Sequence, residues 1–426
     1  TRVFVNGTQS HSYTGTTNFT NNGWFIGGGP DTEFNDINIS NFRVVTGTAL
    51  YTSNFTPPTS ELTAVTNTAL LTCQGSDFFA DNSSNSLTIT KNGGPTFATF
   101  GPFDAADAGE GGMTWIKSRT SANTAYIYDT ERGATTSVTP SDTYAQESSG
   151  TTLTAFNSNG FSLGSANKVN GSSNNYASWT FRKAPKFFDC VTYTGTGVAK
   201  AIAHNLGSVP GMIIVKNTSN TANWRVYHRS TGELGGMVLN DTSAFADFAG
   251  YWNDVSPTDT EFTVGWNNEV NADTQTYVAY LFAHNDSGDG EFGPDGDQDI
   301  IKCGSYTGNG STAGPEIDLG FEPQWMLTKR ADSGSFWNLV DVSRGWTADG
   351  NWKVLYANLS DAEADGSSNT YALNSTGFKV TSTSSSYNAS GGTYIYMAIR
   401  RGPLAPPEAG TEVFAPALTN SGSLPN

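Results

Sequence analysis

The sequence predicts an all-β protein, and three observations support this prediction. Of the 426 residues, 12% are aromatic and only 14% are charged, while glycine occurs 47 times. This composition is typical of short strands joined by tight turns. Apolar and polar residues alternate in many short segments, whereas helical periodicity is nearly absent and only residues 360–365 are expected to form one helical turn. The third observation is a segment pattern that recurs along the chain.

The first 103 residues contain several strand-like segments. Residues 3–5 (Val-Phe-Val) run into Asn6-Gly7, a dipeptide that favours a β-hairpin with a two-residue turn. Apolar and β-branched composition predicts further strands at residues 24–27, 37–44, 70–73 and 87–89.

This N-terminal part resembles a known fold family. The resemblance rests on four runs: Val-Asn-Gly at 5–7, Phe-Ile-Gly at 25–27, Ile-Ser-Asn-Phe-Arg-Val-Val at 39–45 and Leu-Tyr at 50–51. In this combination they are similar to the C-terminal half of a laminin-G-like, concanavalin-A-type jelly roll. The resemblance implies a partial concanavalin-A-like jelly roll, and because the chain opens inside strand-like sequence we expect that an N-terminal portion is missing.

A second pattern fills the remainder of the chain. Cys190 and Tyr193 recur as Cys303 and Tyr306 at one constant offset, together with the glycines that follow them. Three lysines, each followed at the same distance by a polar residue, mark three copies of the pattern: Lys117 with Asp129, Lys216 with His228, and Lys329 with Asp341. Each copy closes with an alternating aromatic strand that begins at Tyr176, Tyr277 or Tyr394.

The copies therefore read as three tandem β-sandwich modules, because short alternating segments between Gly, Asn and Ser turns are typical of that architecture. The first copy lacks the Cys and Tyr opening and is expected to be shortened. The predicted domains are the jelly-roll part (1–103), a shortened module (104–185), a second module (186–287), a third module with an acidic Gly-rich entry loop (288–403) and an extended C-terminal arm (404–426).

The modules also resemble repeats of large structural proteins in marine tailed phages, such as those of cyanobacteria. Residues 204–216 and 223–228 carry this resemblance. It implies a non-enzymatic virion protein of the tail-fibre, head-fibre or capsid-decoration type, exposed on the surface of the extracellular particle. Its expected partners are other virion proteins, copies of itself (for instance a trimer) and a host-surface glycan. The alternative is a carbohydrate-binding or glycan-degrading, depolymerase-like surface protein.

Charge and hydropathy exclude other classes of protein. The chain has 22 basic against 39 acidic residues and a net charge of −17, which argues against nucleic-acid binding. No apolar run is long enough to predict a transmembrane helix, so we expect no membrane partner.

No catalytic residues are predicted. His204 precedes Leu206-Gly207 and is interpreted as bracing a turn, and His228 is interpreted as making a structural hydrogen bond shared with Asp129 and Asp341. Glycan cleavage would need a carboxylate pair, for which the candidates are Asp254 with Asp259 and Glu261 with Glu269. We interpret these acids as solvated surface groups. The cysteines are expected to be free, with Cys190 and Cys303 buried.

Two sets of residues are candidate binding sites. Acidic side chains interspersed with glycine can wrap Ca²⁺, which would be the one cofactor, and the candidates are Asp286, Asp289, Glu291, Asp295, Asp297 and Asp299. Tryptophans in loops without a copy-to-copy match could contact a glycan or a partner, and these are Trp252, Trp266, Trp346 and Trp352.

Overall fold

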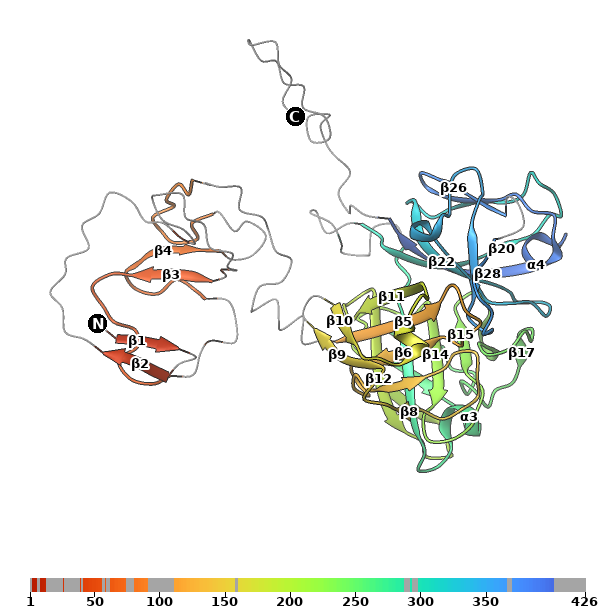
Figure 1. Cartoon of the computed structure of the whole chain (residues 1–426), viewed down its shortest axis with the longest axis horizontal. Coiled ribbons are helices and arrows are strands. Elements are labelled where there is room, and N and C mark those ends of the chain that lie inside the picture. The colour runs from red at the N-terminus through yellow and green to blue at the C-terminus, as the bar shows by residue number, and fades with distance from the viewer. Residues whose placement is uncertain are drawn as a thin grey trace, which may run out of the picture. The chain divides into compact units, whose positions relative to one another are not determined.

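The computed structural model is all-β and separates into two compact units, Thr1–Glu110 and Gly111–Asn426 (Figure 1). In the first unit it describes residues 2–5, 8–12, 26, 39, 41–55, 58, 62–73 and 80–90. In the second unit it describes residues 111–157, 160–286, 292, 298–365 and 370–401. The C-terminal arm predicted at 404–426 lies outside the described residues.

The first unit contains two antiparallel strand pairs. β1 (Arg2–Val5) pairs with β2 (Thr8–Ser12), and Val5 lies opposite Thr8, so the predicted hairpin with a two-residue connection is confirmed. β3 (Phe42–Val45) pairs with β4 (Thr68–Thr72). Of the residues that carry the jelly-roll resemblance, positions 6–7, 25, 27 and 40 are not described.

The strand predicted at residues 87–89 is wrong, because this segment has no strand partner. Its backbone is held by a side chain instead. The Asp81 carboxylate accepts hydrogen bonds from the backbone N–H groups of Leu71 and Leu87, at 3.0 and 2.8 Å. These bonds lower the pKa of Asp81 and fold the segment back as a loop.

The second unit consists of three modules, of which the first spans β5 to β11. Its main sheet has the order β11-β5-β6-β7-β8, and β9 and β10 form a hairpin beside it. The elements are β5 (Gly112–Ser118), β6 (Tyr126–Asp129), β7 (Thr136–Val138), β8 (Glu147–Ser148), β9 (Leu153–Asn157), β10 (Gly160–Leu163), α2 (Asn167–Asn170) and β11 (Tyr176–Arg182).

Module 2 spans β12 to β19 and has a six-stranded sheet of order β12-β19-β14-β15-β16-β17, with β13 and β18 as a second layer. Its elements are β12 (Phe188–Thr194), β13 (Lys200–Ala203), β14 (Met212–Asn217), β15 (Arg225–His228), β16 (Gly232–Val238), β17 (Ala246–Asp247), β18 (Glu261–Val264), α3 (Asn268–Asn271) and β19 (Thr276–Phe282).

Module 3 spans β20 to β28 and repeats this order as β20-β28-β22-β23-β24-β25, with β21, β27 and β26 as the second layer. Its elements are β20 (Ile301–Thr307), β21 (Glu316–Asp318), β22 (Pro323–Arg330), β23 (Asn338–Asp341), the 3-10 turn η1 (Val342–Arg344), β24 (Lys353–Tyr356), β25 (Ala364–Asp365), β26 (Tyr371–Asn374), β27 (Gly377–Val380), α4 (Ser385–Asn388) and β28 (Thr393–Arg400).

The helical turn expected at residues 360–365 is absent, and strand β25 ends there instead. Short helices occur where none was predicted, directly before the closing strand of each module. In module 2, the Tyr277 hydroxyl donates a hydrogen bond to the Asn268 carbonyl oxygen at 2.7 Å and accepts one from the Ala272 N–H at 2.7 Å. Tyr176 and Tyr394 make the same pair of bonds in the other modules. A tyrosine hydroxyl of the following strand therefore fixes each of these four-residue helices, because local propensity alone does not form helices so short.

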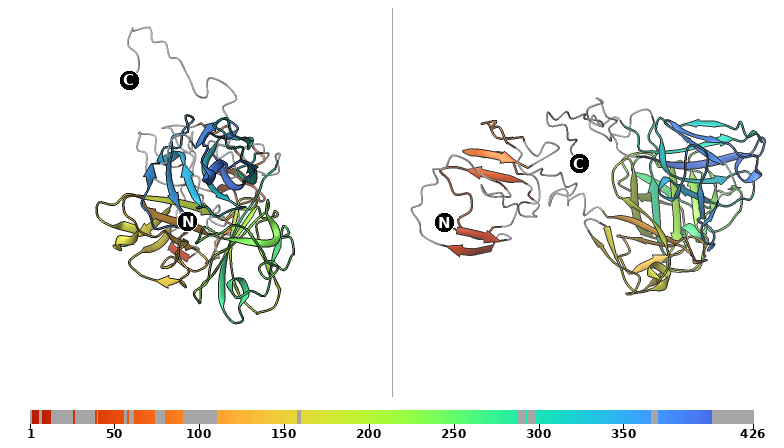
Figure 2. Two further views of the ribbon diagram at one scale, coloured as in Figure 1. Left: turned by 90° about the vertical axis from the view of Figure 1, so that its right-hand side faces the viewer. Right: turned by 45° about the horizontal axis from the view of Figure 1, so that its top comes forward.

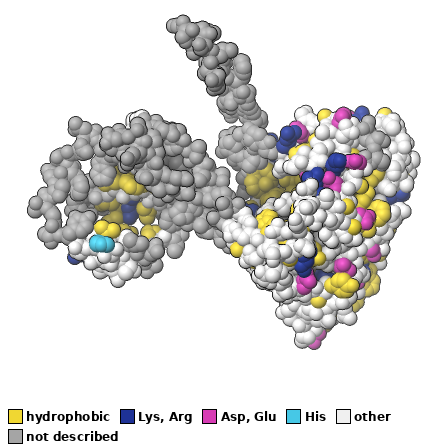
Figure 3. Space-filling model, viewed as in Figure 1, with side chains coloured by type: hydrophobic (Ala, Val, Ile, Leu, Met, Phe, Trp, Pro, Cys, Tyr) yellow, Lys and Arg dark blue, Asp and Glu magenta, His cyan; other side chains and the backbone are white. Residues whose placement is uncertain are grey.

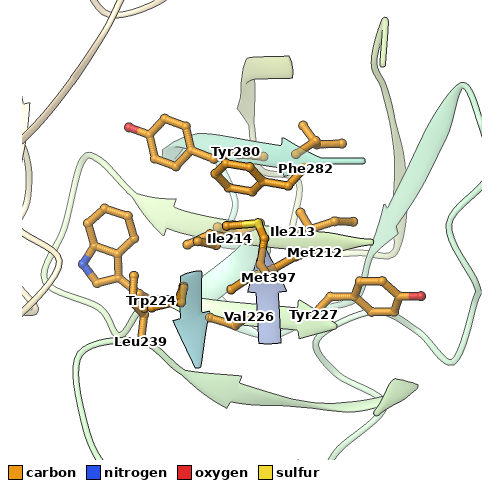
Figure 4. Close-up of a cluster of buried hydrophobic side chains, with 14 of the residues drawn as sticks. Met212, Ile213, Ile214, Trp224, Val226, Tyr227, Leu239, Tyr280, Phe282 and Met397 are labelled. Atoms are coloured by element: carbon orange, nitrogen blue, oxygen red, sulfur yellow. The ribbon is translucent and has the colours of Figure 1, made fainter. Parts of the chain in front are cut away.

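The central strands of the main sheets are buried on both faces, whereas alternation of apolar and polar residues is typical of strands with one buried face. Every residue of β5 and β14 is buried. One face of each sheet packs under its own second layer, whereas the other face joins a core that all three modules share. Figure 4 shows Met397 of β28 among Ile214 and Val226 of module 2.

The three modules close into a ring around this shared core (Figure 2, left). The repeated lysines join the modules, because each Nζ donates one hydrogen bond within its own module and one to a neighbour. Lys216 reaches the Thr143 carbonyl oxygen of module 1 at 2.8 Å, and Lys329 reaches the Thr242 carbonyl oxygen of module 2 at 3.1 Å. Lys117 reaches the Leu359 carbonyl oxygen of module 3 at 2.9 Å. The third contact closes the cycle.

Candidate functional site

The polar residue that follows each lysine lies at a seam between two modules. Asp129, at the end of β6, accepts a hydrogen bond from the Tyr280 hydroxyl of module 2 at 2.7 Å. Asp341, at the end of β23, accepts one from the Trp179 indole Nε1 of module 1 at 3.0 Å. Each carboxylate also pairs with an arginine of its own module, Arg132 or Arg344. These acids hold the modules together.

His228 occupies the same position at the third seam. Its partner strand carries Met397 where the other seams have Tyr280 and Trp179, so no side-chain donor is present. The His228 Nε2 instead bonds to the Tyr396 carbonyl oxygen at 3.1 Å, and Nδ1 accepts from the Ser230 N–H at 3.2 Å. This arrangement requires a neutral ring with its proton on Nε2. Burial lowers the pKa of His228 to about 4. The predicted shared structural bond is therefore present at all three seams.

Burial also perturbs the three seam lysines. It lowers the pKa of Lys117, Lys216 and Lys329 to about 8 in each case. A strongly perturbed amine can mark a catalytic site, but each of these ammonium groups is bonded to two backbone carbonyl oxygens. They are structural groups.

The other predicted polar residues have structural or surface positions. His204 braces its turn as predicted, because its Nδ1 accepts from the Leu206 N–H at 3.2 Å. Glu269 pairs with Arg225 and accepts from Asn223 Nδ2 at 2.8 Å. The other carboxylate candidates, Asp254, Asp259 and Glu261, have exposed side chains. Cys73, Cys190 and Cys303 are free, and the latter two are buried as expected.

Most of the candidate Ca²⁺ ligands cannot be located. Asp289, Glu291, Asp295 and Asp297 lie outside the described residues, while Asp286 and Asp299 lie within them. The Asp299 carboxylate pairs with Lys302 Nζ at 3.3 Å. In the described part of the chain, no group of three or more potential metal ligands is present.

Three of the four candidate tryptophans are in the wrong environment for ligand contact. Trp252, Trp346 and Trp352 are buried, so their rings are not available to a glycan or a partner. The Trp346 indole donates to the Tyr371 carbonyl oxygen at 2.7 Å, and Trp352 packs edge-on against Tyr371. These rings fill the interior of their modules.

Trp266 is exposed, at 49% of its surface, and does not stand alone. Phe248 is also exposed, and its ring centroid lies 6.3 Å from that of Trp266. The Phe248 N–H donates to the Leu234 carbonyl oxygen at 2.9 Å, which brings a third exposed apolar side chain alongside. We call Leu234, Phe248 and Trp266 the aromatic patch.

Module 1 shows that the fold does not require the aromatic patch. The bonds Gly265 N–H to Tyr251 O and Gly164 N–H to Thr152 O are equivalent in modules 2 and 1. When the two modules are aligned on these bonds, Ser165 of module 1 corresponds to Trp266 and Ser149 corresponds to Phe248. The sequence signal that would have revealed Phe248 is this replacement of serine by an aromatic residue at a turn.

Polar groups flank the aromatic patch. The Tyr251 ring contacts Phe248 at a centroid distance of 4.9 Å, and the Arg225 guanidinium lies over Tyr251 at 4.1 Å. Arg225 in turn pairs with Glu269. Exposed rings such as those of Trp266 and Phe248 suit a ligand with an apolar face.

A groove of about 400 Å³ lies at the seam between modules 1 and 3. One wall is strand β11, and the other contains Trp325, Arg344 and Ile399 of module 3. β11 is the edge of its sheet, whereas the equivalent strands β19 and β28 are covered by β12 and β20. The missing opening of the first copy predicted a shortened module, and among the described residues no strand covers the outer edge of β11.

On the face shown in Figure 3, basic and acidic side chains are interspersed over the second unit and form no single-sign patch. Among the described residues, no helix has the length and apolar character that crossing a bilayer requires.

A family model described as a domain of unknown function (DUF7483) matches residues 108–403, more than half of the chain. No curated protein matches the chain. One solved structure, titled "Crystal Structure of the STIV MCP", is 7% identical, with a TM-score of 0.15. The match covers 50% of this chain and 85% of that chain. At that TM-score the likeness carries no argument.

Proposed function

The chain belongs to the DUF7483 family, whose description assigns no activity, and from its surfaces we propose a non-enzymatic structural or adhesion protein of a virion. It acts through its modules in assembly or in attachment to the host surface, as a tail-fibre, head-fibre or capsid-decoration protein. Its partners are other virion proteins and copies of itself, and its place is the particle surface.

One observation carries this proposal. The acids, histidine and lysines that recur among the modules are bonded across module seams, so the repeated polar chemistry is used to hold the ring together. Among the described residues of the second unit, the aromatic patch and the outer edge of β11 are surfaces that other molecules can contact. The phage resemblance of the modules and the strongly acidic composition agree with a particle component present in many copies.

Labelling of intact particles tests this function. Antibodies raised against the purified chain, detected with gold in electron micrographs of purified virions, are expected to bind at one fixed place on capsid, neck or tail. Antibodies depleted on the chain serve as the control. Label that follows unassembled protein and never the particle would overturn the proposal.

A second candidate function, carbohydrate binding, is favoured by the aromatic patch. An exposed indole stacks on the apolar face of a pyranose. The glycan-degrading version would need a catalytic carboxylate pair, and Glu269 is already paired with Arg225.

A glycan array probed with the full chain tests this candidate. The variant Trp266→Ala is expected to lose at least about tenfold in affinity for any glycan bound, which corresponds to about 1.4 kcal/mol. Phe336→Ala, which removes an exposed ring from module 3, is the matched control and should bind as wild type. Equal binding by both variants, or no glycan bound at all, rejects the candidate.

A further inference from the structure

The opening strand has two roles in modules 2 and 3. It pairs with the closing strand, as β12 pairs with β19 and β20 with β28. It also supplies a tyrosine to the outer core. The Tyr193 ring stacks on Tyr277 at 5.1 Å, and the Tyr306 ring stacks on Tyr394 at 4.9 Å. The same tyrosines meet a phenylalanine edge-on, Phe262 or Phe378.

Module 1 retains the receiving side of this arrangement. Tyr176 and Phe161 correspond to Tyr277 and Phe262, and they lie in the same register beside their sheets. Both are only half-buried, whereas Tyr277 and Phe262 are 0% and 2% exposed. The difference marks the place where the opening tyrosine sits in the other two modules.

The backbone of β11 is open along the same line. The bonds from Arg119 N–H to Asn175 O and from Lys183 N–H to Gly111 O show that odd-numbered residues of β11 face β5. Tyr176, Ser178, Thr180 and Arg182 therefore direct their N–H and C=O groups away from the sheet. Within the described residues these groups have no hydrogen-bond partner. In module 2 the corresponding edge bonds to β12, for instance through Ala283 N–H to Phe187 O at 2.9 Å.

We propose that the edge of β11 is a docking site for a β-strand of another polypeptide, a partner subunit in the assembly. The strand pairs antiparallel with β11 and places an aromatic side chain against Tyr176 and Phe161, as Tyr193 and Tyr306 do in their modules. β-Strand addition to an open edge gains affinity from main-chain hydrogen bonds and specificity from such side-chain pockets.

Two further observations favour an occupant from another chain. The chain's own described strands of this type, β12 and β20, are both already paired in their modules. Ser178 and Thr180 are exposed polar residues where module 2 has the buried residues Ala279 and Leu281. Polar side chains on an edge strand keep it soluble while it is unoccupied, as a site that is filled only during assembly requires.

A synthetic peptide with the sequence of residues 188–195, carrying Ser in place of Cys190, is the probe. Fluorescence anisotropy with the full chain is expected to show saturable binding. The same peptide with Ala in place of Tyr193 should bind at least about tenfold more weakly. In the chain, Ser178→Pro removes an outward N–H at an edge position that tolerates proline, and it should also weaken binding about tenfold or more. Ser178→Ala is the control and should bind as wild type.

Hydrogen exchange of the full chain supplies a second measurement that does not depend on the variants. The amides of Ser178 and Thr180 are expected to exchange fast in the free chain and slowly when the peptide is bound. Protection of these amides without peptide would mean that the chain covers its own edge, and absence of peptide binding would mean that the edge accepts no strand. Either result overturns the proposal. The docking site rests on the proposed assembly role. The peptide and exchange measurements use the isolated chain, so a negative result there would not decide the outcome of the particle labelling.

Discussion

Three equivalent positions solve the same bonding problem with different residues. Asp129 and Asp341 accept hydrogen bonds from Tyr280 and Trp179, whereas His228 donates to a backbone carbonyl because Met397 offers no donor. At the seam where the facing strand has Met397 and no side-chain donor, the seam residue is thus a donor, whereas at the other two seams it is an acceptor. A buried polar group without a partner costs about 1–3 kcal/mol. This cost explains why the hydrogen-bonding groups on the two sides of each seam are complementary.

The histidine seam predicts a pH dependence of stability. The pKa of His228 is about 4 in the folded chain and 6.5 for an ordinary histidine, so between these values the unfolded chain binds more protons. Stability is therefore expected to fall as the pH drops from 6.5 towards 4, by up to about 3 kcal/mol.

Urea-unfolding midpoints measured between pH 7 and pH 4 test this pH dependence. His228→Gln retains a donor for the Tyr396 carbonyl oxygen and should lack this part of the acid loss, whereas the exposed His11→Gln should keep it. A His228→Gln chain with the same pH dependence as wild type would contradict the assignment.

At the scale of elements, alternation and repetition predicted much of what the structure contains. Strand β11 begins at the predicted Tyr176, and β19 and β28 begin one residue before the predicted Tyr277 and Tyr394. The N-terminal hairpin pairs β1 with β2 as predicted. The short helices α2 to α4 were not predicted, because four residues have too little helix propensity of their own and each helix is fixed by a tyrosine hydroxyl of the strand that follows it.

The candidate site was harder to predict than the strands. Trp266 was identified correctly as an exposed ring, but Trp346 and Trp352 are unmatched between copies and still buried. Variation between the copies shows only where side chains differ. It does not predict burial, because burial depends on which elements pack over a side chain in three dimensions. Phe248 was missed because its exposure follows from the pairing of β17 with β16.

At the scale of the whole molecule, the ring makes each module dependent on both neighbours. The alternating pattern predicted sheets with one buried face, and the second buried face appears only when three modules meet around one core. A substitution that weakens one seam should therefore destabilise both of the modules that meet there.

Asp341→Ala tests this coupling at the seam of modules 3 and 1. It removes the acceptor of the Trp179 indole and the partner of the buried Arg344 guanidinium, and should destabilise the second unit by about 3 kcal/mol. Hydrogen exchange followed by mass spectrometry should show faster exchange in β22, β23 and also β11. Asp365→Ala removes an exposed ion pair of module 3 and is the control. Acceleration confined to module 3 would show that the seam does not couple the modules.

The ring is made by one chain, and this has a consequence for how its surface can diversify. In a ring of three identical subunits, every substitution enters three times, so a change suited to one seam or one face is imposed on all of them. Here each position exists once. The chain can carry serine at one turn and tryptophan at its counterpart, or leave one edge without its strand, while the other two modules stay complete. Because the three modules are linked in one chain, each of them can carry a different surface.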